Sequence, residues 1–253
     1  MTPAGRFTEL ARTGGRGALV TVLAGTSPGA KMLVLTDGST EGTLGDPVLD
    51  EVAARHADEL MWSERSEPRE ESDTTLFIDV TVPPPRLIVF GAVDFAAALC
   101  RLARAAGWRP FVVDPRARFA QPARFPDAEE VVAAWPEEAF ARIGGIDRAT
   151  AIAILTHDPK LDDAALVLAL RSDAGYIGAM GSRRAQDKRR ERLLAKGIDE
   201  ADLARVSAPI GLDLGALTAE ETALSIMAEI VAMRHGRDGG RLAHSSGRIH
   251  EVV

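Results

Sequence analysis

The sequence predicts an α/β protein in which a small α+β domain precedes a larger domain built on a parallel sheet. Short apolar runs alternate with segments of helical periodicity along the second part of the chain, a pattern typical of βαβ units. Three consecutive prolines, Pro83 to Pro85, stiffen the connection before this part into an extended spacer. We therefore place the first domain at residues 1–82, the parallel-sheet domain at 83–240 and a C-terminal tail at 241–253.

The composition excludes several classes of protein. Apolar residues make up 46% of the 253 residues and charged residues 26%, which is ordinary for a globular domain. The formal net charge of −7 argues against a broad nucleic-acid-binding surface. The single cysteine, Cys100, excludes an intrachain disulfide and a cysteine-based zinc site. No apolar run approaches the ~18 residues of a membrane span, and the N-terminus lacks the apolar core of a signal peptide, so we expect a cytoplasmic protein without a membrane partner.

Two strands and a helix are predicted in the first part of this domain. The runs Gly17–Leu23 and Lys31–Thr36 suit a pleated sheet, and the Asp37-Gly38 pair after them favours a hairpin turn. Asp46 and Pro47 are typical of a helix start. We assign the inner stripe of this helix to Val48, Val52, His56, Glu59 and Leu60.

The end of the first domain is predicted to be irregular before one last strand. Residues 63–75 are polar and charged, so they bury too little apolar surface to order by themselves. Leu76–Val82 then has the pattern of a short strand.

The second domain contains four predicted buried strands, at residues 86–90, 110–114, 151–156 and 174–180. The helical segments between and after them cover 95–106, closed by Gly107, then 162–171, an arginine-rich stretch after Ser182, and a last helix opened by the capping box of Thr218 and Glu221. The apolar face of that last helix consists of Ala223, Ile226, Met227, Ile230 and Val231.

Ligands of open parallel sheets bind at the carboxyl ends of the strands. The candidate cofactor-binding residues are therefore those that follow the predicted strands: Gly91, Asp114, Arg116, His157, Asp158, Gly178, Gly181, Ser182, Arg183 and Asp213. We assign no catalytic residue and no metal ligand, and Cys100 has the pattern of an inert helical cysteine.

The first strand ends in Gly91-Ala92-Val93-Asp94, the outline of a Rossmann-like dinucleotide fingerprint. Val93 replaces the glycine that lets the backbone approach a pyrophosphate, and Asp94 adds a negative charge there. The sequence therefore favours the Rossmann-like fold more than it favours NAD(P) binding.

The next two strand ends carry charged pairs. Asp114 is placed to accept a hydrogen bond from a ribose and Arg116 to contact an anion, although a loop cap and a solvated arginine are the alternatives. His157 next to Asp158 is a candidate general base, a ligand-orienting residue or a structural residue, because adjacent side chains of a strand point to opposite faces.

The glycine-rich end of the fourth strand is the clearest anion site. Gly178 and Gly181 allow close approach of the backbone to a ligand, Ser182 suits a helix N-cap, and Arg183 adds donors for phosphate. From Lys188 onward we interpret the charged residues as a solvated helix face. The loop that contains Asp213 either closes over the site or serves as a plain connector.

Taken in order, these strand ends resemble the XdhC/CoxI family of xanthine dehydrogenase accessory proteins. The resemblance covers nearly the whole chain and rests on residues 27–32, 87–92, 113–116, 155–158, 176–184, 208–216 and 225–230. Its most specific parts are the Tyr-Ile-Gly-Ala-Met-Gly-Ser-Arg-Arg and Ala-Pro-Ile-Gly-Leu-Asp runs. The chain differs from the family at Val93-Asp94, in place of Gly-His, and at residues 42–47, where many members carry a Gly-Gly-Cys or Gly-Gly-Gly run.

The resemblance implies a cofactor-binding chaperone rather than an enzyme. It implies the molybdenum cofactor, molybdopterin or its nucleotide form, as bound cargo, and a molybdenum hydroxylase as the client that receives it. It also implies assistance in sulfuration of the metal, with a cysteine desulfurase as a further partner, and leaves a homodimer open. The alternatives are an NAD(P)-dependent oxidoreductase and an interaction adaptor of the same fold without a ligand.

Overall fold

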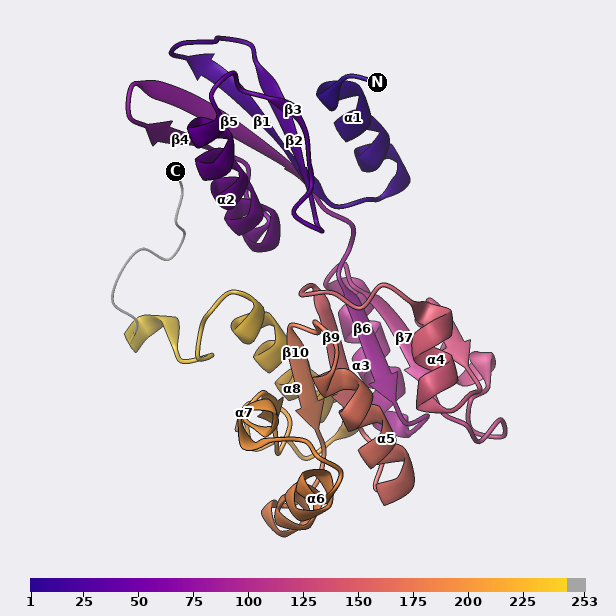
Figure 1. Ribbon diagram of the computed structural model, residues 1–253. Helices are drawn as coiled ribbons and strands as arrows, with labels where there is room; N and C mark the ends of the chain where they lie inside the picture. The colour runs from indigo at the N-terminus through magenta and orange to yellow at the C-terminus, as the bar shows by residue number, and fades with distance from the viewer. Residues whose placement is uncertain (245–253) are drawn as a thin grey trace. The chain divides into compact units, whose positions relative to one another are not determined.

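The structure, a computed structural model, describes residues 1–244 as two compact units, 1–84 and 85–244 (Figure 1). The larger part of the predicted tail at 241–253 lies outside the described residues. None of the helices within residues 1–244 combines the length and the apolar character needed to cross a membrane.

The first unit is an antiparallel sheet with two helices. In spatial order its strands are β3 (Thr40–Thr43), β2 (Lys31–Leu35), β1 (Gly17–Ala24), β5 (Thr74–Thr81) and β4 (Glu67–Glu71). The helices are α1 (Pro3–Thr13) and α2 (Pro47–Ser63). The turn between β2 and β3 is held by Asp37, whose Oδ1 accepts from the amide of Ser39 at 2.9 Å. The predicted hairpin is thus present, and its second strand is β3.

The predicted inner stripe of α2 is wrong in most of its positions. Ala53, Ala57, Leu60 and Met61 are the buried residues of this helix, whereas Val48 is 72% exposed. Small alanines allow the helix to lie close to the sheet, whereas the predicted stripe of larger side chains, His56 and Glu59 among them, is rotated toward solvent.

The polar stretch at 63–75 is not irregular, which corrects the sequence prediction. Its residues Glu67–Glu71 form β4, which pairs with β5 in the register Glu67 to Ile78. The Glu67 side chain is 4% exposed and forms ion pairs with Arg65 and Arg69. Backbone pairing with β5 supplies the order that apolar burial alone could not, and the ion pairs compensate the buried charge of Glu67.

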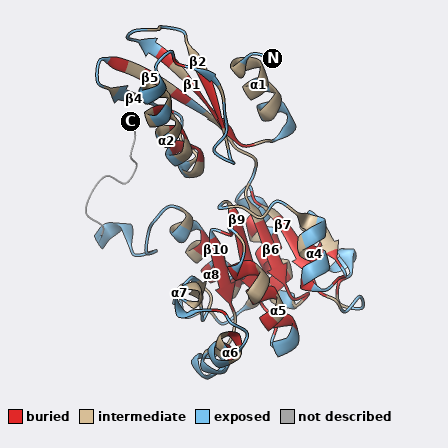
Figure 2. Ribbon diagram, in the orientation of Figure 1, coloured by how far each residue is buried: buried red, intermediate tan, exposed pale blue. Residues whose placement is uncertain are grey.

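The second unit confirms the predicted Rossmann-like sheet. All its strands are parallel, in the order β11 (Val206–Ser207), β10 (Tyr176–Ala179), β9 (Thr150–Ile154), β6 (Arg86–Phe90), β7 (Arg109–Val113) and β8 (Glu130–Val132). Figure 2 shows the four central strands, β10, β9, β6 and β7, mostly buried. The strand order reverses between β6 and β9, which is where such sheets bind ligands.

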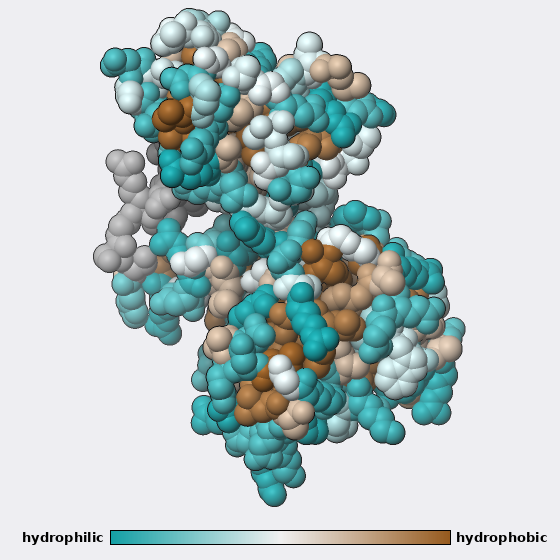
Figure 3. Space-filling model, viewed as in Figure 1, coloured by the Kyte–Doolittle hydropathy of each residue, from teal (hydrophilic) through white to brown (hydrophobic). Residues whose placement is uncertain are grey.

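Helices cover both faces of this sheet: α3 (Asp94–Ala105), α4 (Pro136–Ile143), α5 (Pro159–Leu170), α6 (Arg183–Ala195), α7 (Glu200–Leu203) and α8 (Ala219–Arg234), with single 3-10 turns at Pro122–Arg124 and Leu242–His244. Leu87 and Val89 of β6 pack with α3 and α8, while Ile88 and Phe90 pack with α4 and α5. This alternation explains why β6 is a continuous apolar run. On the visible face, apolar side chains gather where β10 and α5 lie (Figure 3).

Candidate functional site

The candidate site lies at the carboxyl ends of β6, β7, β9 and β10. Gly91 ends β6 with φ +113°, and a Cβ atom at this position would lie 2.5 Å from Cγ2 of Thr156. The ends of β6 and β9 therefore meet so closely at the switch point that only glycine fits there.

Asp114 is fully buried, and its carboxylate is satisfied within the protein. Oδ2 accepts from the amide of Ala92 at 2.9 Å and from Nη2 of Arg116 at 2.8 Å, and Oδ1 accepts from the amide and Nε of Arg116 at 3.0 and 2.9 Å. Burial alone would raise the pKa of Asp114, but these hydrogen bonds hold it below its ordinary value. The residue joins the fingerprint loop to the end of β7 and has all four acceptor positions occupied.

Arg116 is oriented by this carboxylate and by an aromatic ring. Its guanidinium lies 4.6 Å from the ring centroid of Phe119, and 43% of its side chain is exposed. An arginine held in this way is partly preorganised and still reachable by an anion.

Arg124 and Asp94 form an ion pair at the start of α3. Nη1 of Arg124 donates to the carbonyl of Ala92 at 3.0 Å, and Nη2 donates to Oδ1 of Asp94 at 3.2 Å. Val93 occupies the N-cap position and makes no capping hydrogen bond. The helix end that binds pyrophosphate in dinucleotide-binding folds is here next to a carboxylate.

The end of β9 does not assemble a histidine–carboxylate dyad. Asp158 caps α5, accepting from the amide of Lys160 at 2.9 Å, so this helix begins at Pro159 and not at Asp162 as predicted. His157 is exposed beside it. Thr156, which the sequence analysis passed over, is buried and donates a hydrogen bond to Asp162.

The two glycines of the β10 end have different roles. A Cβ atom on Gly178 would meet Cδ1 of Ile210 at 2.5 Å and the hydroxyl of Tyr176 at 2.6 Å, so protein atoms fill the space that we expected a ligand to approach. Gly181 adopts φ +134° and turns the chain into α6. Ser182 caps that helix as predicted, with its Oγ accepting from the amide of Ala185 at 3.3 Å.

Arg183 begins α6 and is exposed. The first turn of α6 contains no acidic residue. Free amides, the positive end of the helix dipole and an exposed guanidinium thus lie together at this corner, which is the chemistry that binds phosphate.

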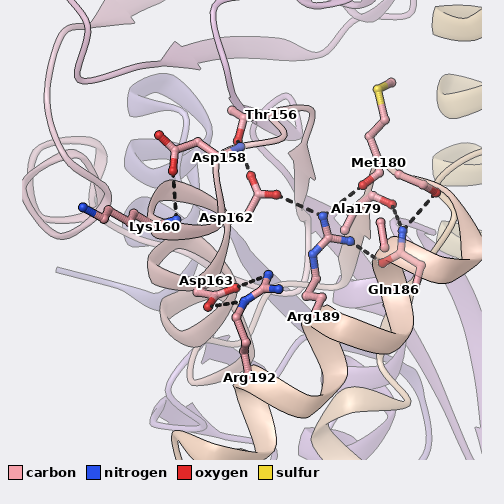
Figure 4. Close-up of polar contacts among 12 residues, drawn as sticks. Thr156, Asp158, Lys160, Asp162, Asp163, Ala179, Met180, Gln186, Arg189 and Arg192 are labelled. Atoms are coloured by element: carbon pink, nitrogen blue, oxygen red, sulfur yellow. Dashed lines mark hydrogen bonds and ion pairs between the residues drawn. The ribbon is translucent and has the colours of Figure 1, made fainter.

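A buried ion-pair network supports this corner, and the sequence analysis missed it (Figure 4). Nη2 of Arg189 donates to Oδ2 of Asp162 at 3.0 Å and to the carbonyl of Met180 at 3.0 Å, and Nη1 donates to Gln186. The side chains of Arg189 and Asp162 are only 7% and 4% exposed. Burial raises the pKa of Asp162, although the hydrogen bonds from Thr156 and Arg189 act to lower it.

A second ion pair lies beside the first. Asp163, 2% exposed, accepts from Nε and Nη2 of Arg192 and from Nζ of Lys196, each at 3.0 Å. Our interpretation of the residues from Lys188 onward as a solvated face is therefore wrong for Arg189 and Arg192. The sequence contains a signal for these pairs. Asp162 and Asp163 interrupt the buried face of α5, the helix before the arginine-rich segment.

The loop around Asp213 is fastened to the sheet and to α8. The amide of Ile210 donates to the carbonyl of Ala179 at 3.1 Å, and the amide of Gly211 donates to Oε2 of Glu229 at 2.8 Å. The amide of Leu212 donates to the carbonyl of Ser225 at 3.2 Å. Asp213 itself is exposed at the tip of this connection.

The described residues offer little to a metal ion. No group of three or more His, Cys, Asp and Glu side chains among residues 1–244 is arranged to hold one. Cys100 is fully buried on α3, and burial raises its thiol pKa to about 12. A thiol with such a pKa supplies no thiolate near neutral pH.

Comparison with known proteins identifies the family of this chain. The XdhC Rossmann domain model matches residues 87–230, and the XdhC and CoxI family model matches residues 10–72. In a crystal structure of a xanthine dehydrogenase from Bacillus halodurans, 91% of this chain and 66% of that chain superpose with a TM-score of 0.63 at 26% identity.

Three curated relatives are similar along part of their length. A probable xanthine dehydrogenase subunit of Bacillus subtilis is 30% identical over 66% of this chain and 48% of its own. The molybdenum cofactor insertion chaperone PaoD of Escherichia coli is 28% identical over 65% of this chain and 45% of its own. The uncharacterized protein YqeB of Escherichia coli is 27% identical over 88% of this chain and 44% of its own. This chain spans about half the length of these relatives. With the XdhC Rossmann domain matched across most of its second unit, the chain belongs to the XdhC and CoxI family.

Proposed function

We propose that this protein binds the molybdenum cofactor as cargo and assists its insertion into a xanthine dehydrogenase-type molybdenum hydroxylase. The name of its relative PaoD, a molybdenum cofactor insertion chaperone, supports this role. The observation that carries the proposal is the corner of Ser182 and Arg183 at the start of α6. Molybdopterin ends in a phosphate, and this corner combines the donors that a phosphate requires.

In this proposal the cargo is held by its anionic end. No group of three or more His, Cys, Asp and Glu side chains among the described residues is arranged to hold a metal ion, and the thiol of Cys100 is buried and protonated. The metal end of the cofactor is then left free of protein ligands for transfer to the client. A sulfuration step takes place on the bound cofactor, with a cysteine desulfurase as the sulfur donor, and does not pass through Cys100. The protein acts as a carrier and not as a catalyst.

The test is a titration of the purified protein with released molybdenum cofactor, with PaoD as the positive control. We expect binding at about 1:1, and we expect Arg183→Ala to weaken it by about 1–3 kcal/mol, since one charge-assisted hydrogen bond is lost. Arg190→Ala is the matched control, because Arg190 lies on the same helix and pairs with Glu200 at the surface.

Two results would contradict the proposal. If PaoD binds the cofactor and this protein does not, the cargo role fails. If the protein binds but Arg183→Ala and Arg190→Ala behave alike, the phosphate lies elsewhere.

A further inference from the structure

The N-terminal unit contains a cavity of about 270 Å³ that has no part in the site described above. Val22 of β1 and Leu49 and Val52 of α2 form part of its apolar wall. Hydroxyl and carboxylate side chains from the adjoining segments line the other side of the cavity, among them those of Ser27, Asp46, Glu71, Ser72 and Thr74. The cavity thus combines an apolar wall with polar oxygen atoms.

Close backbone contacts shape this cavity. Gly45 has φ +98°, and a Cβ atom there would lie 2.9 Å from Oγ of Ser27. Gly25 has φ +124°, and a Cβ atom there would lie 2.6 Å from Oγ1 of Thr74. Both glycines let hydroxyl-bearing side chains lie against bare backbone.

Two oxygen atoms on the wall have no partner among residues 1–244. Thr74 is only 9% exposed, and its hydroxyl forms no hydrogen bond to any described residue. Asp46 uses Oδ1 to accept from the amide of Val48 at 2.8 Å, whereas its Oδ2 has no described partner. A hydroxyl and a carboxylate oxygen that no described residue occupies can each accept a hydrogen bond from a ligand.

The charge around the cavity selects a cation. Residues 1–84 contain 14 Asp and Glu against 7 Lys and Arg, a difference of −7 that equals the formal net charge of the whole chain. Glu71 lines the cavity, and the nearest basic group in an ion pair with it is His56, whose Nε2 lies 3.6 Å from Oε2. The positive end of the α2 dipole is offset by two carboxylates: Asp46 accepts from the amide of Val48 in the first turn, and Asp50 of the first turn accepts from the amide of Leu44 before the helix.

We propose that this cavity binds an organic cation with an alkyl stem, the chemistry of an arginine or lysine side chain. The charged head donates to Glu71, Asp46 and Thr74, and the stem lies on the apolar wall. A metal ion does not suit the cavity, because the described residues contain no group of three or more metal-ligating side chains. An anion is repelled by the two carboxylates on its wall.

The test uses the full chain with labelled valine and leucine methyl groups, titrated with agmatine and followed by NMR. We expect saturable shifts of the methyl groups of Val22, Leu49 and Val52. The neutral probe n-pentanol and inorganic phosphate serve as controls. A pentapeptide, Gly-Gly-Arg-Gly-Gly, distinguishes a protein side chain from a free amine as the source of the cation: binding of the peptide indicates the former, and binding of agmatine alone the latter.

Matched variants locate the contact. Glu71→Gln is expected to weaken agmatine binding about tenfold, since a charge-assisted hydrogen bond becomes a neutral one. Glu70→Gln removes the same charge from the preceding residue of β4, which bonds to Thr75, and is expected to leave binding nearly unchanged. Thr74→Val, of similar volume, is expected to weaken binding without loss of fold. The proposal is wrong if the methyl signals do not shift, if pentanol or phosphate binds as well as agmatine, or if Glu71→Gln and Glu70→Gln behave alike.

Discussion

Replacing Arg189 by methionine removes the charge that fastens α6 to the rest of its unit. Arg189 is one of only two buried residues of this helix, the other being Leu193. The substitution keeps an unbranched side chain of similar length but leaves Asp162 buried with Thr156 as its remaining side-chain donor. Removal of one partner from a buried pair costs about 3–5 kcal/mol, because the other charge stays desolvated.

We expect Arg189→Met to favour local opening of α6 more than unfolding of the whole unit. Hydrogen exchange of the amides in residues 183–195, followed by mass spectrometry, separates this opening from unfolding of the whole unit. A loss of about 3–5 kcal/mol corresponds to exchange faster by roughly two to four orders of magnitude. The control is Arg190→Met at the neighbouring residue, whose pair with Glu200 is 55% and 60% exposed and is worth at most about 1 kcal/mol.

The penalty of Arg189→Met also depends on pH with a definite sign. Burial already raises the pKa of Asp162 above its ordinary value, and loss of the guanidinium raises it further. An acid with a raised folded-state pKa contributes stability below its unfolded pKa and loses it as the pH rises through the folded pKa. Arg189→Met is therefore expected to cost less at pH 5 than at pH 8, after correction for intrinsic exchange. Equal exchange in the Arg189 and Arg190 variants, or a greater penalty at low pH, would refute the anchoring role of this pair.

Three further substitutions test other parts of the structure. Gly91→Ala forces a Cβ atom to 2.5 Å from Thr156 at positive φ and is expected to cost more than Gly107→Ala, where φ is +81° but no atom lies within 4 Å; thermal unfolding compares them. Cys100 is expected to resist a thiol reagent at pH 8 in the folded protein and to react in denaturant, because its thiol pKa is about 12; rapid labelling of the native protein would contradict its burial. Thr218→Ala removes the capping box of α8 and is expected to lower the free energy of unfolding by about 1 kcal/mol, with urea denaturation as the measurement.

The strands and helices of the second unit were largely predictable because their signals are local. Each central strand is a short apolar run, and the capping box at Thr218 marks the start of α8 where the structure has it. The short edge strands β8 and β11 and the helix α4 were not predicted. They contain too few residues to show a period, and their order comes from pairing and packing with neighbours distant in the sequence.

The candidate site was predictable in position but not in its internal contacts. The glycine and serine signals at Gly181 and Ser182 are local, so the start of α6 was found. The pairing of Asp162 with Arg189 joins residues 27 positions apart on two helices. A charged residue looks the same in the sequence whether it is solvated or buried against a partner, and only the tertiary fold distinguishes the two.

Under the proposed function, the ion pairs of α6 link anion binding to the stability of a single helix. The proposed donors for the anion lie at the first turn of α6, and the contacts that fix this turn lie on its flank, at Arg189 and Arg192. Because the helix has so little apolar surface to bury, its position rests on these charges. A bound anion adds negative charge at the start of the helix, where it stabilises the same helix through the dipole. Under the proposed function, anion binding and helix order are thermodynamically linked. A partner that displaces α6 would then weaken anion binding, and the anion would weaken binding of that partner by the same coupling free energy.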